Sequence, residues 1–484
     1  MDKRAFYDTL PILASADIIV AGGGLSGCAA AIASARTGAD TLLIESGGCL
    51  GGAATAGLVA PISSIRSNDG KHPFGGILQE LLDTVTAKAK KYCASSIMPI
   101  SSLHLYKYIL LDKLKDSGAN VFFHLFITDV VSDADGSIRY LVVSSKDGLK
   151  RIEGKIFIDT TGDGDVMGKS AADTIIGSEP HVLADIADTG LLKSHDKQTD
   201  IPEDDYAGKL QPVSLMMQFG GVDVKRATQY MNKKITYADF GITREEFAKW
   251  PYAGTLGFEM DDSEYIPMPQ GRVWLYPAIR DGVATINMSR VLNINACDPK
   301  AYSDAEVKAG LQLIAIIDFL LTFVPGFENA YFMESSNTLG IRESRRLVGD
   351  YVLRGREVIC CQEFPDTIAH GSYIIDIHDP KGKRMAIGGE IKKPHYSIPY
   401  GCLVTRKVPN LATAGRSISA DHVAMSATRI QGTAMLTGQA AGIAASMALA
   451  AGCTMSDVDV TVLQNKLTEA GVFLDLPDRN GCGK

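Results

Sequence analysis

Three glycines near the start of the chain, and one glutamate beyond them, have the residue types and spacing needed to hold a nucleotide. Gly22, Gly24 and Gly27 fit the pattern G-x-G-x-x-G. In such a loop the first glycine permits a tight turn, the second lets the backbone approach a pyrophosphate, and the third lets a helix pack closely on a strand. Glu45 follows at the distance from which a carboxylate accepts hydrogen bonds from a ribose 2′-hydroxyl. These residues predict a dinucleotide-binding site.

The segments on either side of this loop are expected to be strands and a helix, which would hold the loop in position. Residues 17–21 form a run typical of a buried parallel strand, residues 25–37 form an Ala-rich helix that ends at Gly38, and residues 41–44 form a second buried strand. A phosphate beside Leu25 and Ser26 would lie on the N-terminus of this helix, where free N–H groups and the helix dipole favour negative charge. This order of elements favours nucleotide binding over a purely structural glycine turn.

A run of small residues follows Glu45 and extends to Gly57. So many small residues cannot form a good core, and we infer that they allow close backbone approach to a bulky flat group such as a flavin. The candidate cofactor contacts in this run are Ser46, Gly51, Gly52, Thr55 and Gly57. Further glycine-rich turns occur at Asp163 and at Gly415-Arg416. FAD spans farther than NAD and needs contacts from later in the chain, so three such turns favour FAD.

The remaining segments predict an α/β fold with a three-layer Rossmann-like FAD-binding domain, built on a parallel sheet plus a β-meander. Helices are expected over 77–90, 102–117, 305–323 and 430–451, and strands over 121–131, 138–145, 151–157 and near 213–219, 272–276 and 283–288. Residues 411–416 are expected to form a strand that leads into a turn. The last ninety residues contain a strand, a glycine turn and a helix of small residues, as the start of the chain does. We therefore expect a discontinuous FAD-binding domain of residues 1–175 and 395–484. An inserted mixed α+β substrate domain would comprise residues 176–394.

Composition excludes several functional classes. The chain has 484 residues, of which 46% are hydrophobic and 21% charged, as in ordinary globular proteins. A net charge of -8 argues against a nucleic-acid surface. Nine cysteines without metal-ligand spacing predict reduced thiols and no zinc site, so we expect a cytoplasmic protein without membrane insertion. The expected partners are a small-molecule substrate and an unidentified electron acceptor, and a homo-oligomer is left open.

Taken in order, these glycine-rich motifs are similar to those of two-domain FAD flavoproteins of the glutathione-reductase superfamily. The nearer resemblance is to bacterial FAD-dependent oxidoreductases allied to the flavoproteins of fumarate reductase and succinate dehydrogenase. It covers most of the chain and includes Gln211-Pro212 and residues 287–291, 340–346 and 398–400.

The resemblance implies roles for the residues of the glycine-rich motifs. Gly22, Gly24 and Gly27 would cradle the pyrophosphate, Glu45 would hold the adenosine ribose, and Asp163 and Arg416 would lie near the cofactor. Many superfamily members have an acid where this chain has Arg416. An arginine there could pair with the pyrophosphate or face solvent.

Candidate catalytic residues lie beside the last glycine turn. Residues 426–432 resemble the stretch that carries a substrate-binding arginine in fumarate reductases, which implies that Arg429 grips a carboxylate. Capping structure or binding flavin phosphate is an equally simple role for Arg429. The unperturbed pKa of a histidine side chain lies near neutrality, so His422 is a candidate general base; a histidine packed under the flavin is the alternative. The other candidates here are Asp421, Gln431, His395, Tyr396 and Tyr400.

Residues 340–346 combine three arginines with Glu343. On a helix Arg342 and Arg346 would share a face and form an anion grip over the active site. An interdomain ion-pair network around Glu343 is the favoured alternative. The absence of close His, Asp and Glu clustering argues against a catalytic metal.

The sequence therefore predicts an FAD-dependent oxidoreductase that transfers a hydride between a small polar organic substrate and flavin N5. Dehydrogenation is the first choice, and reduction of an activated C=C bond, as in fumarate reductase, is the alternative. Residues 27–38 also resemble the first helix of flavoproteins that modify transfer RNA, and a non-catalytic flavin sensor is a further alternative. The attachment of the flavin, covalent or not, is left open.

Overall fold

The structure is a computed structural model that describes residues 3–59, 62–93, 103–180, 182, 184–189, 207–230, 235–253, 264, 266, 274–278, 280–378 and 385–476. Its helices are α1 (Lys3–Tyr7), α2 (Leu25–Arg36), α3 (Gly76–Cys93), α4 (Leu103–Asp116), α5 (Val224–Ala227), α6 (Arg244–Ala248), α7 (Pro299–Phe323), α8 (Gly355–Cys360), α9 (His422–Thr428), α10 (Gln431–Ala451) and α11 (Val460–Glu469).

The strands are β1 (Ile12–Ala21), β2 (Thr41–Ile44), β3 (Asn120–Phe122), β4 (Phe126–Ser132), β5 (Ile138–Ser145), β6 (Gly148–Asp159), β7 (Thr174–Ile176), β8 (Met216–Gly220), β9 (Trp274–Pro277), β10 (Ala284–Asn287), β11 (Tyr331–Ser335), β12 (Arg345–Leu347), β13 (Thr367–Gly371), β14 (Ile375–His378), β15 (Met385–Gly389), β16 (Tyr396–Pro399) and β17 (Leu411–Thr413). The starts expected at Ser102 and Arg272 lie outside the described residues.

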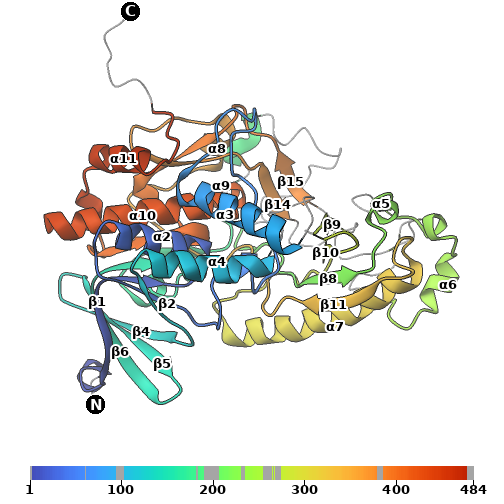
Figure 1. Ribbon diagram of the computed structural model, residues 1–484, viewed down its shortest axis with the longest axis horizontal. Coiled ribbons are helices and arrows are strands. Elements are labelled where there is room, and N and C mark those ends of the chain that lie inside the picture. The colour runs from blue at the N-terminus through green and yellow to red at the C-terminus, as the bar shows by residue number, and fades with distance from the viewer. Residues whose placement is uncertain are drawn as a thin grey trace, which may run out of the picture.

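The largest sheet positions the first glycine loop. Its strand order is β3-β2-β1-β6-β5-β4, and β17 pairs with β6. Strands β1, β2, β3, β6 and β17 run parallel, whereas β4, β5 and β6 form an antiparallel meander (Figure 1). The residues of β1 from Ile18 to Ala21 are buried, as expected for a parallel strand covered on both faces. The predicted parallel sheet with a β-meander, typical of a Rossmann-like FAD-binding fold, is confirmed.

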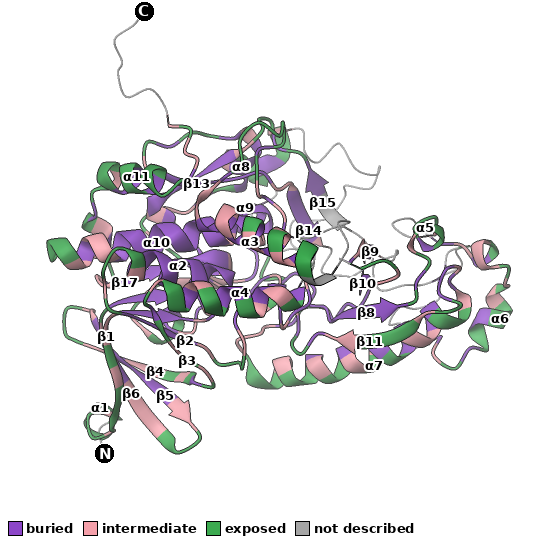
Figure 2. Cartoon of the chain, in the orientation of Figure 1, coloured by how far each residue is buried: buried purple, intermediate pink, exposed green. Residues whose placement is uncertain are grey.

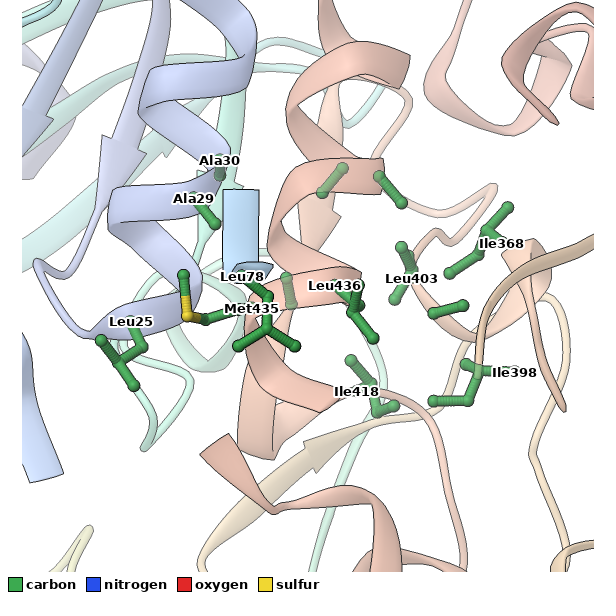
Figure 3. Packing of buried hydrophobic residues seen from close by; sticks show 14 of the residues in the cluster. Leu25, Ala29, Ala30, Leu78, Ile368, Ile398, Leu403, Ile418, Met435 and Leu436 are labelled. Atoms are coloured by element: carbon green, nitrogen blue, oxygen red, sulfur yellow. The ribbon is translucent and has the colours of Figure 1, made fainter. Parts of the chain in front are cut away.

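Helices α2 and α10 pack side by side and in parallel across one face of this sheet. A Cβ atom on Gly438 would lie 2.1 Å from the Ser26 carbonyl oxygen, and one on Gly442 would lie 2.3 Å from that of Ala30. The helices therefore approach closely only because glycine occupies these positions. On α10, Met435 lies toward Leu25 and Leu436 faces away from α2 (Figure 3). By length and composition α10 could span a membrane, but 67% of its apolar window is buried inside the fold. It is a core helix.

The two largest hydrophobic clusters of the described residues lie in different parts of the chain. One contains α2, α10 and one face of the main sheet and also includes residues between Leu353 and Val404, whereas the other face of the sheet belongs to a smaller cluster. The second large cluster spans Val213 to Leu339 and packs α7 on the four-stranded sheet β11-β8-β10-β9, which lies to the right in Figure 1. The buried residues, drawn in purple in Figure 2, are concentrated around α2 and α10. The expected domain boundaries at 175 and 395 stay a prediction.

Two expected elements differ from the structure. The single strand expected over 121–131 is two strands, because His124 adopts a left-handed backbone conformation (φ 60°) and its N–H group donates to the Gly47 carbonyl at 3.4 Å. This turn sends β3 to the parallel part of the sheet and β4 to the meander. Residues 340–346 are not helical, since Gly340 bridges Ser214 and β12 pairs with β7. Arg342 and Arg346 therefore do not share a helix face.

Candidate functional site

The three glycines of the first loop differ in what surrounds them. Gly22 has φ +101°, and a Cβ atom there would lie 2.6 Å from the Thr160 carbonyl oxygen. A Cβ atom on Gly27 would lie 1.8 Å from the carbonyl oxygen of Gly22. Gly24, by contrast, is extended, and no described atom comes within 4 Å of a Cβ placed there. Gly22 and Gly27 thus permit packing, whereas Gly24 faces open space.

Glu45 joins the two glycine-rich loops. Its carboxylate accepts hydrogen bonds from the N–H groups of Gly23 and Gly47, both at 2.6 Å, and from the hydroxyl of Ser46 at 3.2 Å. Both loops are therefore fixed at the end of β2, where the expected ribose contact would lie. The ribose role itself stays a prediction.

The run of small residues after Glu45 folds back against the first loop. Gly51 pairs with Gly24 in a parallel bridge, and its N–H group donates to the Gly23 carbonyl at 2.8 Å. A Cβ atom on Gly52 would lie 3.1 Å from the Gly24 Cα. The Thr55 hydroxyl donates to the Leu50 carbonyl at 2.6 Å, which holds the turn. A Cβ atom on Gly57 would lie 2.8 Å from the carbonyl oxygen of Ala53.

The turn after β17 lies against the same helix end. Gly415 has φ +83°, and a Cβ atom there would lie 2.7 Å from Ser26 Oγ. The Arg416 guanidinium pairs with Asp163 at 2.7 Å and donates to Ser344 Oγ at 2.5 Å, and its side chain is 17% exposed. Arg416 and Asp163, which the resemblance places near the cofactor, are thus held together by an ion pair.

These features fit an extended dinucleotide. Ser26, in the first turn of α2, meets Gly438, so the N-terminus of α10 at Gln431 lies about 9 Å beyond that of α2 at 1.5 Å per residue. The two parallel helix N-termini thus point the same way, so one could receive the pyrophosphate and the other, farther along, the flavin. Within the described residues no side-chain hydrogen bond caps the start of α10, and Gln431 Oε1 is buried without a hydrogen-bond partner.

Arg429 comes directly after α9 and just before α10. Its guanidinium pairs with the Asp376 carboxylate at 3.2 Å, and its side chain is 12% exposed. Asp376 Oδ1 lies 3.7 Å from Nδ1 of His378 on the same strand, β14. Burial, together with Arg342, Arg290 and Arg429, holds the pKa of His378 well below its ordinary value, so this imidazole is neutral at pH 7.

His422 lies in a separate buried network at the start of α9. Its ring nitrogen Nδ1 lies 2.9 Å from Glu343, and Arg346 pairs with Glu179 at 2.9 Å. Glu343 also lies 3.5 Å from Arg346, so the favoured ion-pair network around Glu343 is present. Burial raises the pKa of Asp421, which caps α9 by accepting from the Ala424 N–H at 2.7 Å, to about 6. His422 is only 2% exposed, and its role as a base stays a prediction.

The remaining candidates are placed elsewhere in the fold. The Tyr400 hydroxyl donates to the Met455 carbonyl at 2.7 Å, and the Tyr396 hydroxyl donates to that of Ala427 at 3.0 Å. Both tyrosines are buried. His395 packs edge-on against His370, with ring centroids 4.5 Å apart, and lines a small pocket beside the segment that follows α11. The structure therefore groups Arg429 with neither Tyr400 nor His395.

Sequence reasoning missed Arg290, Asp376 and His378. Arg290 belongs to residues 287–291, which carry part of the family resemblance, and this was the only signal available. Asp376 and His378 belong to β14, a strand that the sequence did not indicate. Within the described residues no group of three or more His, Cys, Asp or Glu residues could hold a metal ion.

The sheet, the paired glycine loops and the parallel helix ends define an FAD-binding protein. The profile of a family described as FAD dependent oxidoreductase matches residues 17–467, so the chain belongs to this family. It is an FAD-dependent oxidoreductase. A search of curated protein sequences found no match.

The solved structures matched by this chain are distant in sequence. A geranylgeranyl bacteriochlorophyll reductase-like protein from Thermoplasma acidophilum is 12% identical with a TM-score of 0.41, covering 94% of this chain and 82% of its own. A myxobacterial chondrochloren halogenase is 12% identical with a TM-score of 0.43, covering 94% and 78%. The p-nitrophenol 4-monooxygenase of Pseudomonas putida is 10% identical with a TM-score of 0.40, covering 94% and 85%.

Proposed function

We propose that the chain is a dehydrogenase that removes a hydride from a C–H bond beside a hydroxyl or amine group of a small polar organic substrate. When bound, FAD supplies the acceptor for that hydride at N5. The observation that carries the proposal is the position of Arg429, which directly precedes the α10 N-terminus and is held by Asp376. A guanidinium fixed there orients an acidic group of the substrate, so that the reacting carbon is presented in one geometry.

The same cluster contains a proton acceptor. Oxidation of an alcohol releases a hydride from carbon and a proton from oxygen, and a C=O bond forms. His378 is neutral at pH 7 and its Nδ1 atom lies 3.7 Å from Asp376, so it is placed to accept that proton. Burial and the three neighbouring arginines disfavour the charged imidazole, so the proton is held there only transiently. The two electrons then pass to an external electron acceptor that has not been identified.

A second candidate is reduction of an activated C=C bond, with Arg429 binding a carboxylate or delivering a proton. The additional arginines Arg290 and Arg342 near Arg429 favour it, because carboxylates are common activating groups of such bonds. An anaerobic experiment separates the two reactions. A dehydrogenase substrate bleaches the oxidised flavin, whereas a reductase substrate restores the colour of chemically reduced flavin.

Replacing Arg429 with alanine tests the site itself. We expect Arg429→Ala to keep the yellow colour of bound FAD and to lose at least about 100-fold in turnover, because the substrate loses its orienting group. Arg406→Ala is the matched control, since Arg406 is 71% exposed and pairs with Asp457 at 3.2 Å on the surface. Unchanged turnover in Arg429→Ala would remove this residue from the active site.

A further inference from the structure

Three arginines from separate parts of the chain share one electrostatic environment. Arg290 follows β10, Arg342 precedes β12, and Arg429 ends α9. Each of Arg290 and Arg342 is influenced by Arg429 and by Asp376. Asp376 pairs with Arg429, so within the described part of the chain two guanidinium groups lack a carboxylate partner.

Arg290 and Arg342 converge on one neutral oxygen. Nη1 of Arg290 donates to Ser214 Oγ at 2.5 Å and to Asn287 Oδ1 at 3.1 Å. Nη1 of Arg342 donates to the same Ser214 Oγ at 2.8 Å and to the Pro212 carbonyl at 2.5 Å. Two positive charges are therefore brought together by a hydroxyl, a side-chain amide and a backbone carbonyl, none of which carries a charge.

This arrangement is unfavourable in the absence of an anion. Arg290 is only 4% exposed, and burial together with Arg342 lowers its pKa well below the ordinary value. Burial together with Arg429 lowers the pKa of Arg342 to about 10. Since a guanidinium stays protonated in proteins, these lowered pKa values reflect the cost of keeping like charges close together in a partly dry site.

Unsatisfied hydrogen-bond donors accompany the excess charge. Nε of Arg429 and Nε2 of Gln211 are buried and have no hydrogen-bond partner among the residues that the structure describes. Gln211 is tied to this cluster, because its side-chain oxygen accepts from the His378 N–H at 3.4 Å. Buried donors without partners are rare in native proteins, and acceptor oxygens of a ligand would satisfy them.

We propose that Arg290, Arg342 and Arg429 form a binding site for a small organic dianion, either a dicarboxylate or a phosphate monoester. The two negative charges of such a ligand match the charges of Arg290 and Arg342, the two guanidinium groups that have no carboxylate partner among the described residues. This inference rests on the proposed function, since it makes the dianion the substrate that Arg429 orients. Arg290 and Arg342 are binding residues that select for the second charge.

Calorimetric titration of the FAD-loaded protein tests the charge requirement. At low ionic strength and pH 7.5, malonate, succinate and glycerol 3-phosphate serve as dianions, propionate as a monoanion and glycerol as a neutral probe. We expect a dianion to bind at least about tenfold more tightly than propionate, and glycerol not to bind. Tighter binding of malonate and succinate assigns the ligand to the dicarboxylates, and tighter binding of glycerol 3-phosphate assigns it to the phosphate monoesters. Equal affinities for all charged probes, or no binding, would overturn the proposal.

Substitutions separate ligand binding from a structural role. Arg342→Met and Arg290→Met remove the charge but keep an unbranched, largely apolar stem. In a buffer without carboxylate or phosphate we expect the melting temperature to be unchanged or higher, while affinity for the dianion falls about 10-fold to 100-fold. Arg406→Met is the matched surface control and should leave both unchanged. A lower melting temperature with unchanged affinity would show that the arginines are structural. If Arg290→Met does not fold, Arg342→Met alone still distinguishes the two outcomes.

The two proposals fail in distinguishable ways. Tight dianion binding without bleaching of the flavin by any dianion would leave the binding site standing and refute the dehydrogenase. Bleaching by neutral alcohols or amines, without dianion binding, would refute the dianion site and leave the dehydrogenase standing.

Discussion

Gly24 and Gly27 differ in what a methyl group would meet, and this difference gives a test of the cofactor cradle. Gly24→Ala places the methyl group in open space, so the fold should be retained while the approach of the pyrophosphate is blocked. We expect the purified Gly24→Ala protein to have the native circular dichroism spectrum and at least about tenfold weaker FAD binding. Gly27→Ala should instead fail to fold, because its Cβ atom would overlap the Gly22 carbonyl. A Gly24→Ala protein that binds FAD normally would contradict this assignment.

His370 should make stability depend on pH. Burial and the neighbouring His395 lower the pKa of His370 to about 3, and its Nε2 atom accepts a hydrogen bond from the Asp475 N–H at 2.8 Å. Protonation would replace that acceptor with a second donor. Because the unfolded chain binds the proton from about pH 6.5 downward, the native state loses about 1.4 kcal/mol per pH unit below that value.

Urea unfolding between pH 7 and pH 4 measures this loss. His370→Gln retains an acceptor oxygen and does not titrate, so the free energy of unfolding of the variant should fall less steeply with decreasing pH. His395, whose ring centroid lies 4.5 Å from that of His370, is present in both proteins, so the measured quantity is the difference between the two curves. Parallel curves for the two proteins would show that His370 does not titrate on unfolding.

At the scale of single residues, local sequence spacing was sufficient to predict the geometry of some site residues but not of others. Gly22, Gly24, Gly27 and Glu45 lie within one strand, helix and strand unit, so their geometry follows from a short stretch of chain. Arg290 and Asp376 act with Arg429 only because distant strands pair, and nothing local to either residue indicates that contact.

Among the elements, the contact between α2 and α10 depends on glycine. Gly442→Val should lower the free energy of unfolding by about 3 kcal/mol or more, because the new side chain would press on the Ala30 carbonyl. The control is Gly310→Ala in α7, where a Cβ atom meets nothing within 4 Å, and which should raise stability by about 0.5 to 1 kcal/mol. Thermal or urea unfolding measures both changes. Similar effects of the two substitutions would contradict the close packing of α2 on α10.

Elements with a clear pattern of apolar residues in the sequence were predicted well. The strand expected over 41–44 is β2, and the segment 411–416, expected to be a strand leading into a turn, contains β17. The sequence did not indicate strands β13 to β16. Their residues are buried because distant strands pair, and they are not marked by an alternation of apolar and polar residues. The arginine-rich stretch has helical spacing, but pairing of β12 with β7 overrides that local preference.

At the scale of the whole molecule, we expect bound FAD to stabilise the folded state. A ligand that binds only the folded state stabilises it by about 2.7 kcal/mol when present at 100 times its dissociation constant. We therefore expect the melting temperature of the apoprotein to rise steadily with added FAD in a scanning calorimetry series. Riboflavin lacks the pyrophosphate and the adenosine, so it should raise the melting temperature much less. An FAD-independent melting temperature would contradict binding to the folded state.

The parallel packing of α2 on α10 also has a consequence for synthesis of the chain. The partner of Ala30 is Gly442, and the strand that completes the sheet beside β6 begins at Leu411. Until α10 has been synthesised, the face of α2 that packs on it has no native neighbour. We therefore expect the flavin to be captured only after α10 has left the ribosome, and the exposed face of α2 to need protection from aggregation until then.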